Sequence, residues 1–273
     1  MSGRDGIRPR KRLGQHFLRD RRVVRRILEA LDPGPGDFVL EYGCGTGALT
    51  AALAASGATV LGLEVDRDLL VRLRADPALT AVEFLGEGLE DWPPPRVAER
   101  AGRERIKVVA NLPYQLTSTA IFDAADGAHR IERAVFMMQR EVAVRVQASP
   151  GGRDYGLLPA LVQARHRVDK VADAAPGAFH PPPKVHSRVL RFTARDEPRV
   201  APELWDAYKS LLKAVFAERR KQLRSTLRKF YELDGDFLIE LSESSGLDLS
   251  RRPETLSVEE LVLLARRLPE CRR

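Results

Sequence analysis

The sequence predicts an α/β fold with a mostly parallel sheet, followed by a small all-helical domain. In the first two thirds of the chain, short apolar runs typical of buried strands alternate with segments of helical spacing, which indicates βαβ units. Beyond residue 197 the strand signals stop and only helical spacing remains. A length of 273 residues with 44% hydrophobic content is enough for one medium and one small domain.

The predicted elements follow one another in a regular order. Helical spacing from residue 20 ends at the Asp-Pro-Gly-Pro-Gly run, 32–36. We expect strands at 38–40, 59–63, 82–85, 106–110, 133–138 and 188–192. Further helical patterns cover 48–56, a stretch opened by Asp66 or Arg67, 139–147, 204–216, 237–241 and 258–268. The predicted domains are a basic N-terminal segment at 1–19, an α/β domain at 20–197 and a helical domain at 198–273.

Basic residues are concentrated in two places. The net charge is +7, and residues 1–30 alone hold ten Arg or Lys against three acids. A second basic run spans residues 219–229 and contains no acid. Such runs are found in solvated tails and exposed helix faces, but two of them in one chain favour a nucleic acid partner. The residues expected to bind RNA are Arg10, Lys11, Arg12, Arg219, Arg220, Lys221 and Arg224.

Other features narrow the class of protein. No run of about 18 apolar residues is present, so we expect no membrane span. The basic N-terminus is not followed by an apolar segment, which argues against a secretory signal. Two distant cysteines, Cys44 and Cys271, indicate a reducing compartment, and we expect a cytoplasmic protein. Scattered histidines without metal-ligand spacing predict no metal site.

A glycine-rich loop between a strand and a helix predicts a nucleoside cofactor. The loop reads Glu41-x-Gly43-x-Gly45-x-Gly47, and glycines there let the backbone approach a ligand closely. Glu64 ends the next strand, where a carboxylate can accept both ribose hydroxyls. Glu87 ends the third strand and could accept a hydrogen bond from an adenine amino group. The loop also matches a loose dinucleotide fingerprint, although the acid before the glycines suits a methyl donor better, and a tight turn without a ligand remains the third interpretation.

The fourth predicted strand ends in an unusual combination of residues, Asn111, Pro113 and Tyr114. Parallel strands bind ligands beyond their carboxyl ends, so this segment shares an edge with the glycine loop. An exocyclic amine on a base is a poor nucleophile, and an Asn oxygen with neighbouring carbonyls could orient its lone pair. Proline stiffens the loop, and a tyrosine ring offers a stacking face for an extracted base. The alternative is a proline turn with a local cap and a core tyrosine.

Five segments resemble the rRNA adenine N6-methyltransferase family, and they lie along nearly the whole chain. They are KRLGQHFLRD (11–20), LEYGCGTGALT (40–50), NLPY (111–114), MQREVAVRV (138–146) and AFHPPPKVHSRVLRF (178–192). A sixth segment, FAERRKQLRSTL (216–227), is similar to the helical domain of members that dimethylate adenines in 16S rRNA.

The resemblance implies a Rossmann-like methyltransferase sheet of seven strands, with S-adenosyl-L-methionine as the cofactor. It implies cofactor contacts at His16, Leu18, Glu41, Gly43, Gly45, Glu64, Glu87 and Asn111. It implies a catalytic group of Asn111, Leu112, Pro113, Tyr114 and Phe179, with the Leu112 or Pro113 carbonyl holding the amine. The family often has Asn where His16 stands, Pro where Cys44 stands and Asp where Glu87 stands.

The resemblance therefore implies a monomeric enzyme that dimethylates two adjacent adenosines near the 3′ end of 16S rRNA during small-subunit maturation. A 23S rRNA methyltransferase of the macrolide-resistance type is the nearest alternative. Lys184 after the triple proline and the basic Arg219-Arg220-Lys221 segment favour the small-subunit interpretation. A non-catalytic RNA-binding assembly factor and, more distantly, a dinucleotide-dependent oxidoreductase are alternatives of other classes.

Overall fold

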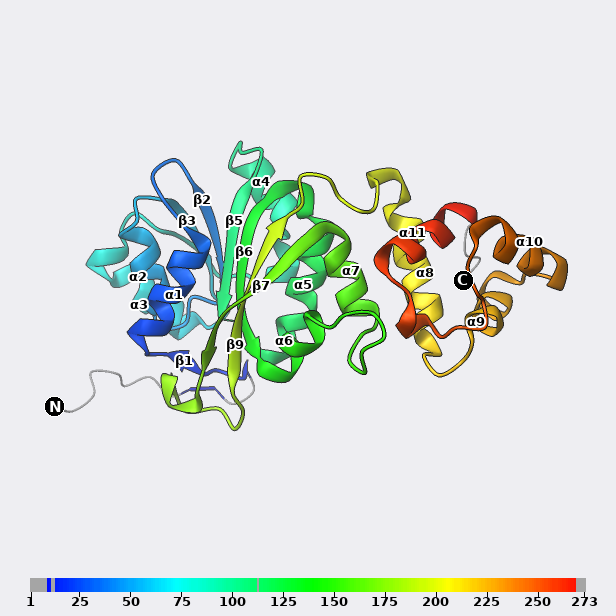
Figure 1. Ribbon diagram of the computed structural model, residues 1–273. Helices are drawn as coiled ribbons and strands as arrows, with labels where there is room; N and C mark the ends of the chain where they lie inside the picture. The colour runs from blue at the N-terminus through cyan, green and yellow to red at the C-terminus, as the bar shows by residue number, and fades with distance from the viewer. Residues whose placement is uncertain (1–8, 11–12, 112, 269–273) are drawn as a thin grey trace. The chain divides into compact units, whose positions relative to one another are not determined.

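A computed structural model describes residues 9–10, 13–111 and 113–268, and it divides the chain into two compact units (Figure 1). The first unit comprises residues 1–143 and 168–194, and the second comprises 144–167 and 195–273. The strands are β1 (Phe17–Leu18), β2 (Phe38–Tyr42), β3 (Thr59–Leu63), β4 (Glu83–Leu85), β5 (Ile106–Asn111), β6 (Ile131–Gln139), β7 (His166–Ala174), β8 (Phe179–His180) and β9 (Ser187–Ala194). The helices are α1 (Arg21–Leu31), α2 (Ala48–Ala54), α3 (Arg67–Ala75), α4 (Pro94–Arg100), α5 (Thr117–Asp126), α6 (Arg140–Val146), α7 (Leu157–Arg165), α8 (Trp205–Ala217), α9 (Leu223–Tyr231), α10 (Gly235–Ser245) and α11 (Val258–Arg267).

The main sheet has seven strands in the order β4-β3-β2-β5-β6-β9-β7. The neighbours from β4 to β6 pair in parallel, whereas β9 pairs antiparallel with β6. The prediction of a seven-stranded, mostly parallel sheet is therefore confirmed. The strand order reverses direction between β2 and β5. Because parallel crossovers are right-handed, the helices on the two sides of this point cover opposite faces and leave a crevice at the strand ends.

Helices α1 and α3 of the first unit begin at side-chain caps. The Asp20 carboxylate accepts a hydrogen bond from the Arg22 backbone N–H at the start of α1, and Asp66 accepts one from Asp68 at the start of α3. Helix α1 buries Val23, Ile27, Ala30 and Leu31 in the sheet core. These caps fix the starts of both helices beside the strand ends.

A buried lysine organises the amino-terminal ends of the strands, at the other end of the sheet from the crevice. Lys107, near the start of β5, is 5% exposed, and its Nζ donates to the Asp37 carboxylate at 2.8 Å and to the Asp32 carbonyl. Glu132 adds a second carboxylate 3.6 Å away. A buried charge needs such partners, so this cluster aligns the strand starts far from the crevice.

The second unit is a bundle around α8. Helices α7, α9 and α11 all contact α8, whose buried face includes Tyr208, Leu211, Leu212 and Val215. The Arg165 guanidinium lies 3.7 Å from the centroid of the Trp205 ring, where a cation–π contact stabilises the start of α8.

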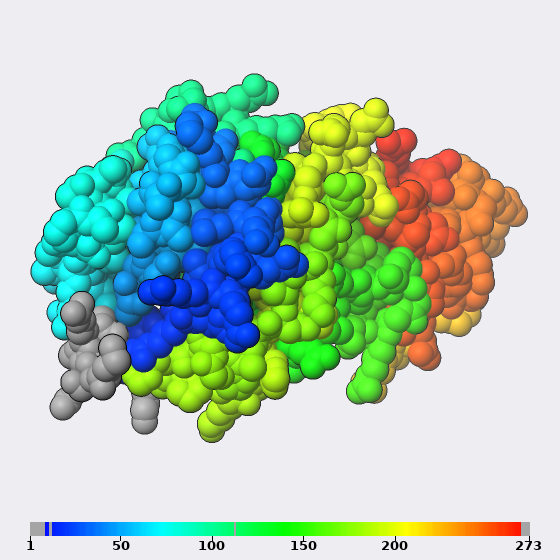
Figure 2. All heavy atoms as spheres, turned by 60° about the vertical axis from the view of Figure 1, so that its left-hand side comes forward, coloured from blue at the N-terminus to red at the C-terminus, as the bar shows by residue number. Residues whose placement is uncertain are grey.

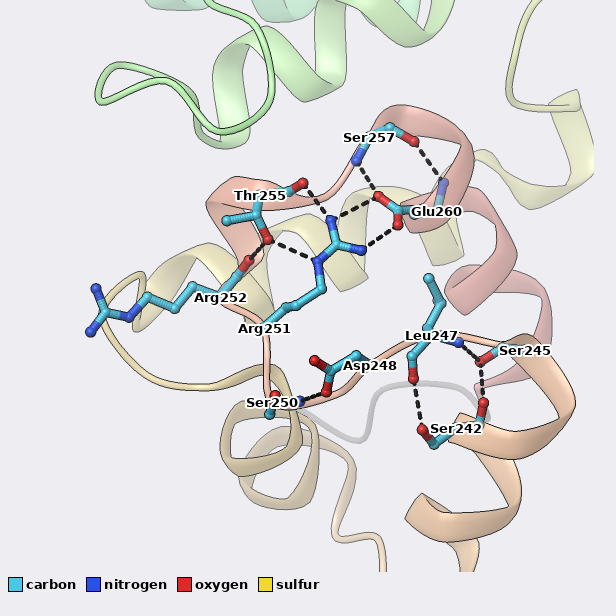
Figure 3. A network of polar contacts seen from close by, with 10 residues as sticks. All are labelled: Ser242, Ser245, Leu247, Asp248, Ser250, Arg251, Arg252, Thr255, Ser257 and Glu260. Carbon is cyan, nitrogen blue, oxygen red and sulfur yellow. Dashed lines mark hydrogen bonds and ion pairs between the residues drawn. The ribbon is translucent and has the colours of Figure 1, made fainter.

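Polar contacts organise the end of this bundle (Figure 3). Arg251 donates to both carboxylate oxygens of Glu260 and to the Thr255 carbonyl, the last at 2.7 Å. Glu260 also completes a capping box with Ser257 at the start of α11, which satisfies two backbone N–H groups. One arginine therefore ties the loop before α11 to the helix start.

Several elements, among them the helices α4, α7 and α9 and the strands β1, β7 and β8, had no counterpart in the predicted secondary structure. The β7 sequence HRVDKVADA mixes charges into the strand and buries only its two end residues, so it shows no clean alternation. Residues 144–167, which include α7, group with the helical unit by compactness. The domain bounds inferred from the sequence stay a prediction. Among the described helices, none has the length and apolar character needed to cross a membrane.

Candidate functional site

A cavity of about 240 Å³ lies at the carboxyl ends of β2, β3, β4 and β5 in the first unit. Eleven of the residues expected to bind cofactor or substrate line it. They are His16, Leu18, Glu41, Gly43, Gly45, Glu64, Glu87, Asn111, Pro113, Tyr114 and Phe179. Leu112 lies outside the described residues. The fold thus brings together residues that are up to 163 positions apart in the sequence, from 16 to 179.

The glycine loop has a backbone that requires glycine. Gly43, Gly45 and Gly47 have φ of 73°, 57° and 80°, in the left-handed region. The N–H groups of Gly43 and Cys44 both donate to the Leu63 carbonyl, which ties the loop to the end of β3. A Cβ added to Gly43 would meet no heavy atom within 4 Å, so the space in front of this residue can receive a ligand.

Glu64, directly after β3, holds the glycine loop through a hydrogen bond to its backbone. It is 6% exposed, and its Oε2 accepts from the Gly45 N–H at 2.8 Å while Oε1 accepts from the Asp66 N–H at 2.9 Å. Burial raises its pKa, although these backbone N–H groups oppose the rise. A carboxylate has about four acceptor positions, so Glu64 keeps capacity for the two hydroxyls of a ribose.

Glu41 has a buried carboxylate oxygen that suits a positively charged ligand group. Its side chain is 2% exposed, and Oε2 has no hydrogen-bond partner among the described residues. Burial raises its pKa to about 7, an effect that nearby Thr50 and Cys44 partly offset and Glu64 reinforces. A buried carboxylate oxygen without a donor is costly, and an ammonium group would satisfy it. The methionine end of S-adenosyl-L-methionine has such a group, so Glu41 fits this cofactor.

The Asn111 amide is oriented by the N-terminal motif. Its Nδ2 donates to the His16 backbone carbonyl at 3.1 Å, which leaves Oδ1 as the acceptor of the amide. The His16 ring in turn places Nδ1 at 2.8 Å from the Pro181 carbonyl, so Nδ1 carries the proton. The Asn111 oxygen is therefore available for an N–H donor in the cavity.

Two aromatic residues, Tyr114 and Phe179, line the same cavity as this amide. The Tyr114 ring lies 5.9 Å from the His16 ring, with 30° between their planes, and its hydroxyl is 3.4 Å from the Ser187 hydroxyl. Phe179 is 5% exposed and belongs to the apolar core, yet it also lines the cavity. The Pro113 carbonyl accepts from the Leu116 N–H at 2.9 Å and retains one lone pair for a substrate amine.

Segments from distant parts of the chain pair at this site. Strands β1 and β8 form a small antiparallel sheet in which Phe17 faces His180 and Leu18 faces Phe179. The Ala178 carbonyl then accepts from the Arg19 N–H at 2.8 Å. Figure 2 shows the blue N-terminal residues against the yellow-green residues of the segment that contains β8. The N-terminal motif and the proline-rich loop therefore fold as one wall of the cavity.

Glu87 differs from the other acids because it is exposed. Its Oε2 accepts a hydrogen bond from the Trp92 indole N–H. The sequence interpretation missed several lining residues, among them Gln15, Tyr42, Leu89, Gln115, Met137 and Ser187. Gln15, Tyr42 and Ser187 belong to segments that carried the resemblance, but Leu89, Gln115 and Met137 are ordinary core-type or loop residues without a sequence signal.

The residues expected to bind RNA are distributed differently. Arg10 makes ion pairs with Asp66 at 3.4 Å and Asp68 at 2.6 Å, and Lys11 and Arg12 lie outside the described residues. Arg219 donates to the Arg153 and Tyr155 carbonyls at 3.0 and 2.7 Å, within the helical unit. The structure thus gives Arg10 and Arg219 internal partners, and their contact with RNA stays a prediction.

The other basic residues of the second run lie on the surface. Arg220, Lys221 and Arg224 are exposed around the start of α9, and Arg228 and Lys229 continue the basic surface along the helix. We refer to these five residues as the α9 basic face. Within the described part of the chain, no group of three His, Cys, Asp or Glu side chains could hold a metal ion.

Known proteins match this chain over nearly its full length. The family model described as ribosomal RNA adenine dimethylase matches residues 6–268. Proteins named ribosomal RNA small subunit methyltransferase A are 42% identical in Syntrophotalea carbinolica and 40% in Geobacter metallireducens. These matches cover 94% and 96% of this chain and 96% of each relative.

Solved structures agree on the fold. A dimethyladenosine transferase from Plasmodium falciparum has a TM-score of 0.75 at 22% identity, over 91% of this chain and 96% of that one. The 23S rRNA methyltransferase ErmE has a TM-score of 0.69 at 26% identity, over 92% and 99%. The family uses S-adenosyl-L-methionine, which Glu41, Glu64 and the glycine loop fit. The chain belongs to the ribosomal RNA adenine dimethylase family.

Proposed function

We propose that this protein transfers methyl groups from S-adenosyl-L-methionine to N6 of adenines in 16S rRNA of the small subunit. The proposed product is a pair of adjacent dimethyladenosines near the 3′ end, formed by a monomer in the cytoplasm during subunit maturation. The observation that carries the reaction is the Asn111 amide, whose Nδ2 is occupied by the His16 carbonyl, which leaves Oδ1 as an acceptor in the cavity that Tyr114 also lines.

The chemistry requires orientation rather than a strong base. The lone pair of an adenine amine is delocalised into the ring, so its N–H groups must be held while the lone pair turns toward the methyl. Asn111 Oδ1 and the second lone pair of the Pro113 carbonyl can accept those two N–H groups. Bound S-adenosyl-L-methionine supplies a methyl group on a positively charged sulfur, which needs no further activation. The protein then contributes mainly proximity and alignment.

The base must leave its helix to reach the cavity. Tyr114 offers a face on which an extracted adenine can stack, and the contact of its hydroxyl with Ser187 anchors the far end of the side chain. Phe179 is held by the pairing of β8 and by the core. From the proline-rich loop, it can restrict the position of the base. Stacking on an aromatic ring contributes about 1–3 kcal/mol per base, enough to offset much of the unstacking cost.

The experiment compares 30S and 50S particles as substrates. The protein is incubated with each particle and labelled S-adenosyl-L-methionine, and modified adenines are mapped by mass spectrometry of rRNA fragments. We expect dimethyladenosine in 16S rRNA only. Label in 23S rRNA would instead support the activity named for ErmE, whose structure is similar to this chain. Cofactor binding without transfer to either RNA would support an assembly factor.

Two matched variants test the stacking role. Tyr114→Phe keeps the ring and should retain most activity, whereas Tyr114→Ala should lower kcat/KM for 16S rRNA by about five- to 150-fold, as expected for about 1–3 kcal/mol. Asn111→Ala should abolish transfer while the thermal unfolding temperature stays near that of the wild type. Equal activity of the two Tyr114 variants, or normal turnover of Asn111→Ala, would contradict this mechanism.

A further inference from the structure

Trp92 contacts two residues of the cavity wall, Tyr42 and Glu87, but does not itself line the cavity. Its indole Nε1–H donates to Glu87 Oε2, and its backbone carbonyl accepts from the Tyr42 hydroxyl at 3.1 Å. Tyr42 ends β2, and Glu87 follows β4, two strands away in the sheet. Trp92 therefore joins the two strand ends that border the outer part of the cavity.

Three features hold the Trp92 ring in place. The Arg96 and Arg100 guanidinium groups lie 4.3 and 5.4 Å from the ring centroid. Each guanidinium has an anchor of its own, since Arg96 donates to the Asp91 carbonyl at 2.6 Å and Arg100 to the Glu83 carboxylate at 3.0 Å. Prolines follow directly, at residues 93–95, and restrict the backbone after the tryptophan. The direction of the indole N–H is thus fixed before any ligand binds.

We propose that Trp92 is a positioning residue that orients the Glu87 carboxylate toward the 6-amino group of the cofactor adenine. Glu87 is exposed, and a free glutamate at the surface would adopt many rotamers. The indole N–H occupies Oε2 and leaves Oε1 as an acceptor. A carboxylate held in this way accepts a hydrogen bond from an amine, and it has no donor for a purine that lacks the amine.

The inference deepens the proposed cofactor site, because it requires adenine to lie against Glu87. The expected change in Kd follows from the rotamer freedom that Glu87 would lose on cofactor binding if Trp92 did not already hold it. Ordering one flexible side chain costs an amount that corresponds to roughly a two- to tenfold change in Kd. Trp92→Phe keeps the ring and the contacts with Arg96 and Arg100 but removes the N–H, so it should weaken adenine recognition by that factor.

The test uses two ligands and isothermal titration calorimetry. One ligand is S-adenosylhomocysteine, and the other is its analogue with hydrogen in place of the 6-amino group. Trp92→Phe should raise Kd for the first ligand two- to tenfold and leave Kd for the second unchanged, so the preference for the amine shrinks. Because each preference is a ratio within one protein preparation, partial misfolding does not alter it. An unchanged preference in Trp92→Phe would overturn the inference.

Matched controls separate the possible failures. The only other tryptophan of the chain, Trp205, lies in the helical unit, and Trp205→Phe should leave both affinities as in the wild type. Glu87→Gln should also lose the preference, and the double variant with Trp92→Phe should lose no more than Glu87→Gln alone. A preserved preference in Glu87→Gln would refute the placement of adenine itself. A loss confined to Glu87→Gln would refute only the role of Trp92, and neither result depends on which rRNA is methylated.

Discussion

The titration of Glu41 should control how tightly the cofactor binds. Burial raises the pKa of this carboxyl from its ordinary 4.5 to about 7, and its Oε2 has no donor among the described residues. At about 1.4 kcal/mol per pKa unit, ionising Glu41 in the protein costs roughly 3 kcal/mol more than ionising an exposed glutamate. A ligand ammonium that needs the ionised form must offset this cost. Protonation of Glu41 should therefore weaken binding.

The raised pKa sets the direction and the size of the pH dependence, both for stability and for cofactor affinity. The contribution of protonated Glu41 to stability is fully present below pH 4.5 and is lost as the pH rises through about 7. Cofactor affinity runs the opposite way, since only ionised Glu41 pairs with the ammonium. Glu41 is about half ionised at pH 7 and roughly 3% ionised at pH 5.5, so Kd should be about fifteenfold higher at pH 5.5. An α-amino group stays protonated over this range.

The assay is calorimetric titration with S-adenosylhomocysteine at half-unit steps between pH 5.5 and 7. Glu41→Gln is the control, because an amide of the same shape does not titrate. We expect a clearly steeper slope in the wild type than in the variant, and weaker binding by the variant than by the wild type at pH 7. Burial also raises the pKa of neighbouring Glu64, and its contribution is common to both proteins. Parallel slopes in the two proteins would refute the assignment to Glu41.

Three further predictions concern stability and RNA. Lys107→Met should lower the free energy of unfolding by about 3 kcal/mol in urea titrations, because it leaves Asp37 without its buried partner; a loss below 1 kcal/mol would contradict this. Arg251→Ala should cost about 1–2 kcal/mol in the helical unit by removing the two bonds to Glu260, and unchanged hydrogen exchange in α11 would argue against it. Removing Lys221 and Arg224 from the α9 basic face should reduce the slope of log K for RNA against log salt by about 2, while Lys209→Ala should not.

Much of the sheet could be predicted because its strands are buried on both faces. Strand β3 was expected at 59–63 and is observed there, and β5 extends the expected 106–110 by one residue. Such strands read as continuous apolar runs between glycine, proline and polar residues. Strand β7 escaped because it sits at the sheet edge, where charged residues replace apolar ones on the open side. Helix α7 contains Pro159 in its first turn and follows a glycine-rich loop, and these residues masked its pattern.

The site was predictable where function demands unusual residues. Glycines with positive φ and acids at strand ends have few structural explanations, so Gly43, Glu41 and Glu64 stood out in the sequence, and all three line the cavity. The partners that set the geometry of the site residues could not be found from the sequence. The bond between Asn111 and the His16 carbonyl joins residues 95 positions apart through backbone atoms, which no side-chain pattern records. Trp92 likewise precedes three prolines without any pattern that links it to Glu87, and the contact is visible only in the structure.

Cys44, which stands where the family often has proline, is explained by packing. A Cβ added to Gly62 would lie 2.5 Å from the Cys44 sulfur, so the thiol fills the space left by that glycine in β3. Burial first, and then the Glu41 and Glu64 carboxyls, raise the pKa of the thiol well above its ordinary value. A thiol in that state is a small apolar group rather than a nucleophile. The residue therefore supports the loop and has no part in the chemistry.

His16 shows why a second departure from the family pattern is compatible with methyl transfer. The group that orients Asn111 is the His16 backbone carbonyl, which any residue supplies. The side chain has a different task, since its Nδ1–H donates to the Pro181 carbonyl and ties the N-terminal motif to the proline-rich loop. An asparagine amide also has an N–H donor of suitable reach, so histidine and asparagine can perform the same task. The orientation of the Asn111 amide thus depends on how the backbone of this wall is held, and the pairing of β1 with β8 helps to hold it.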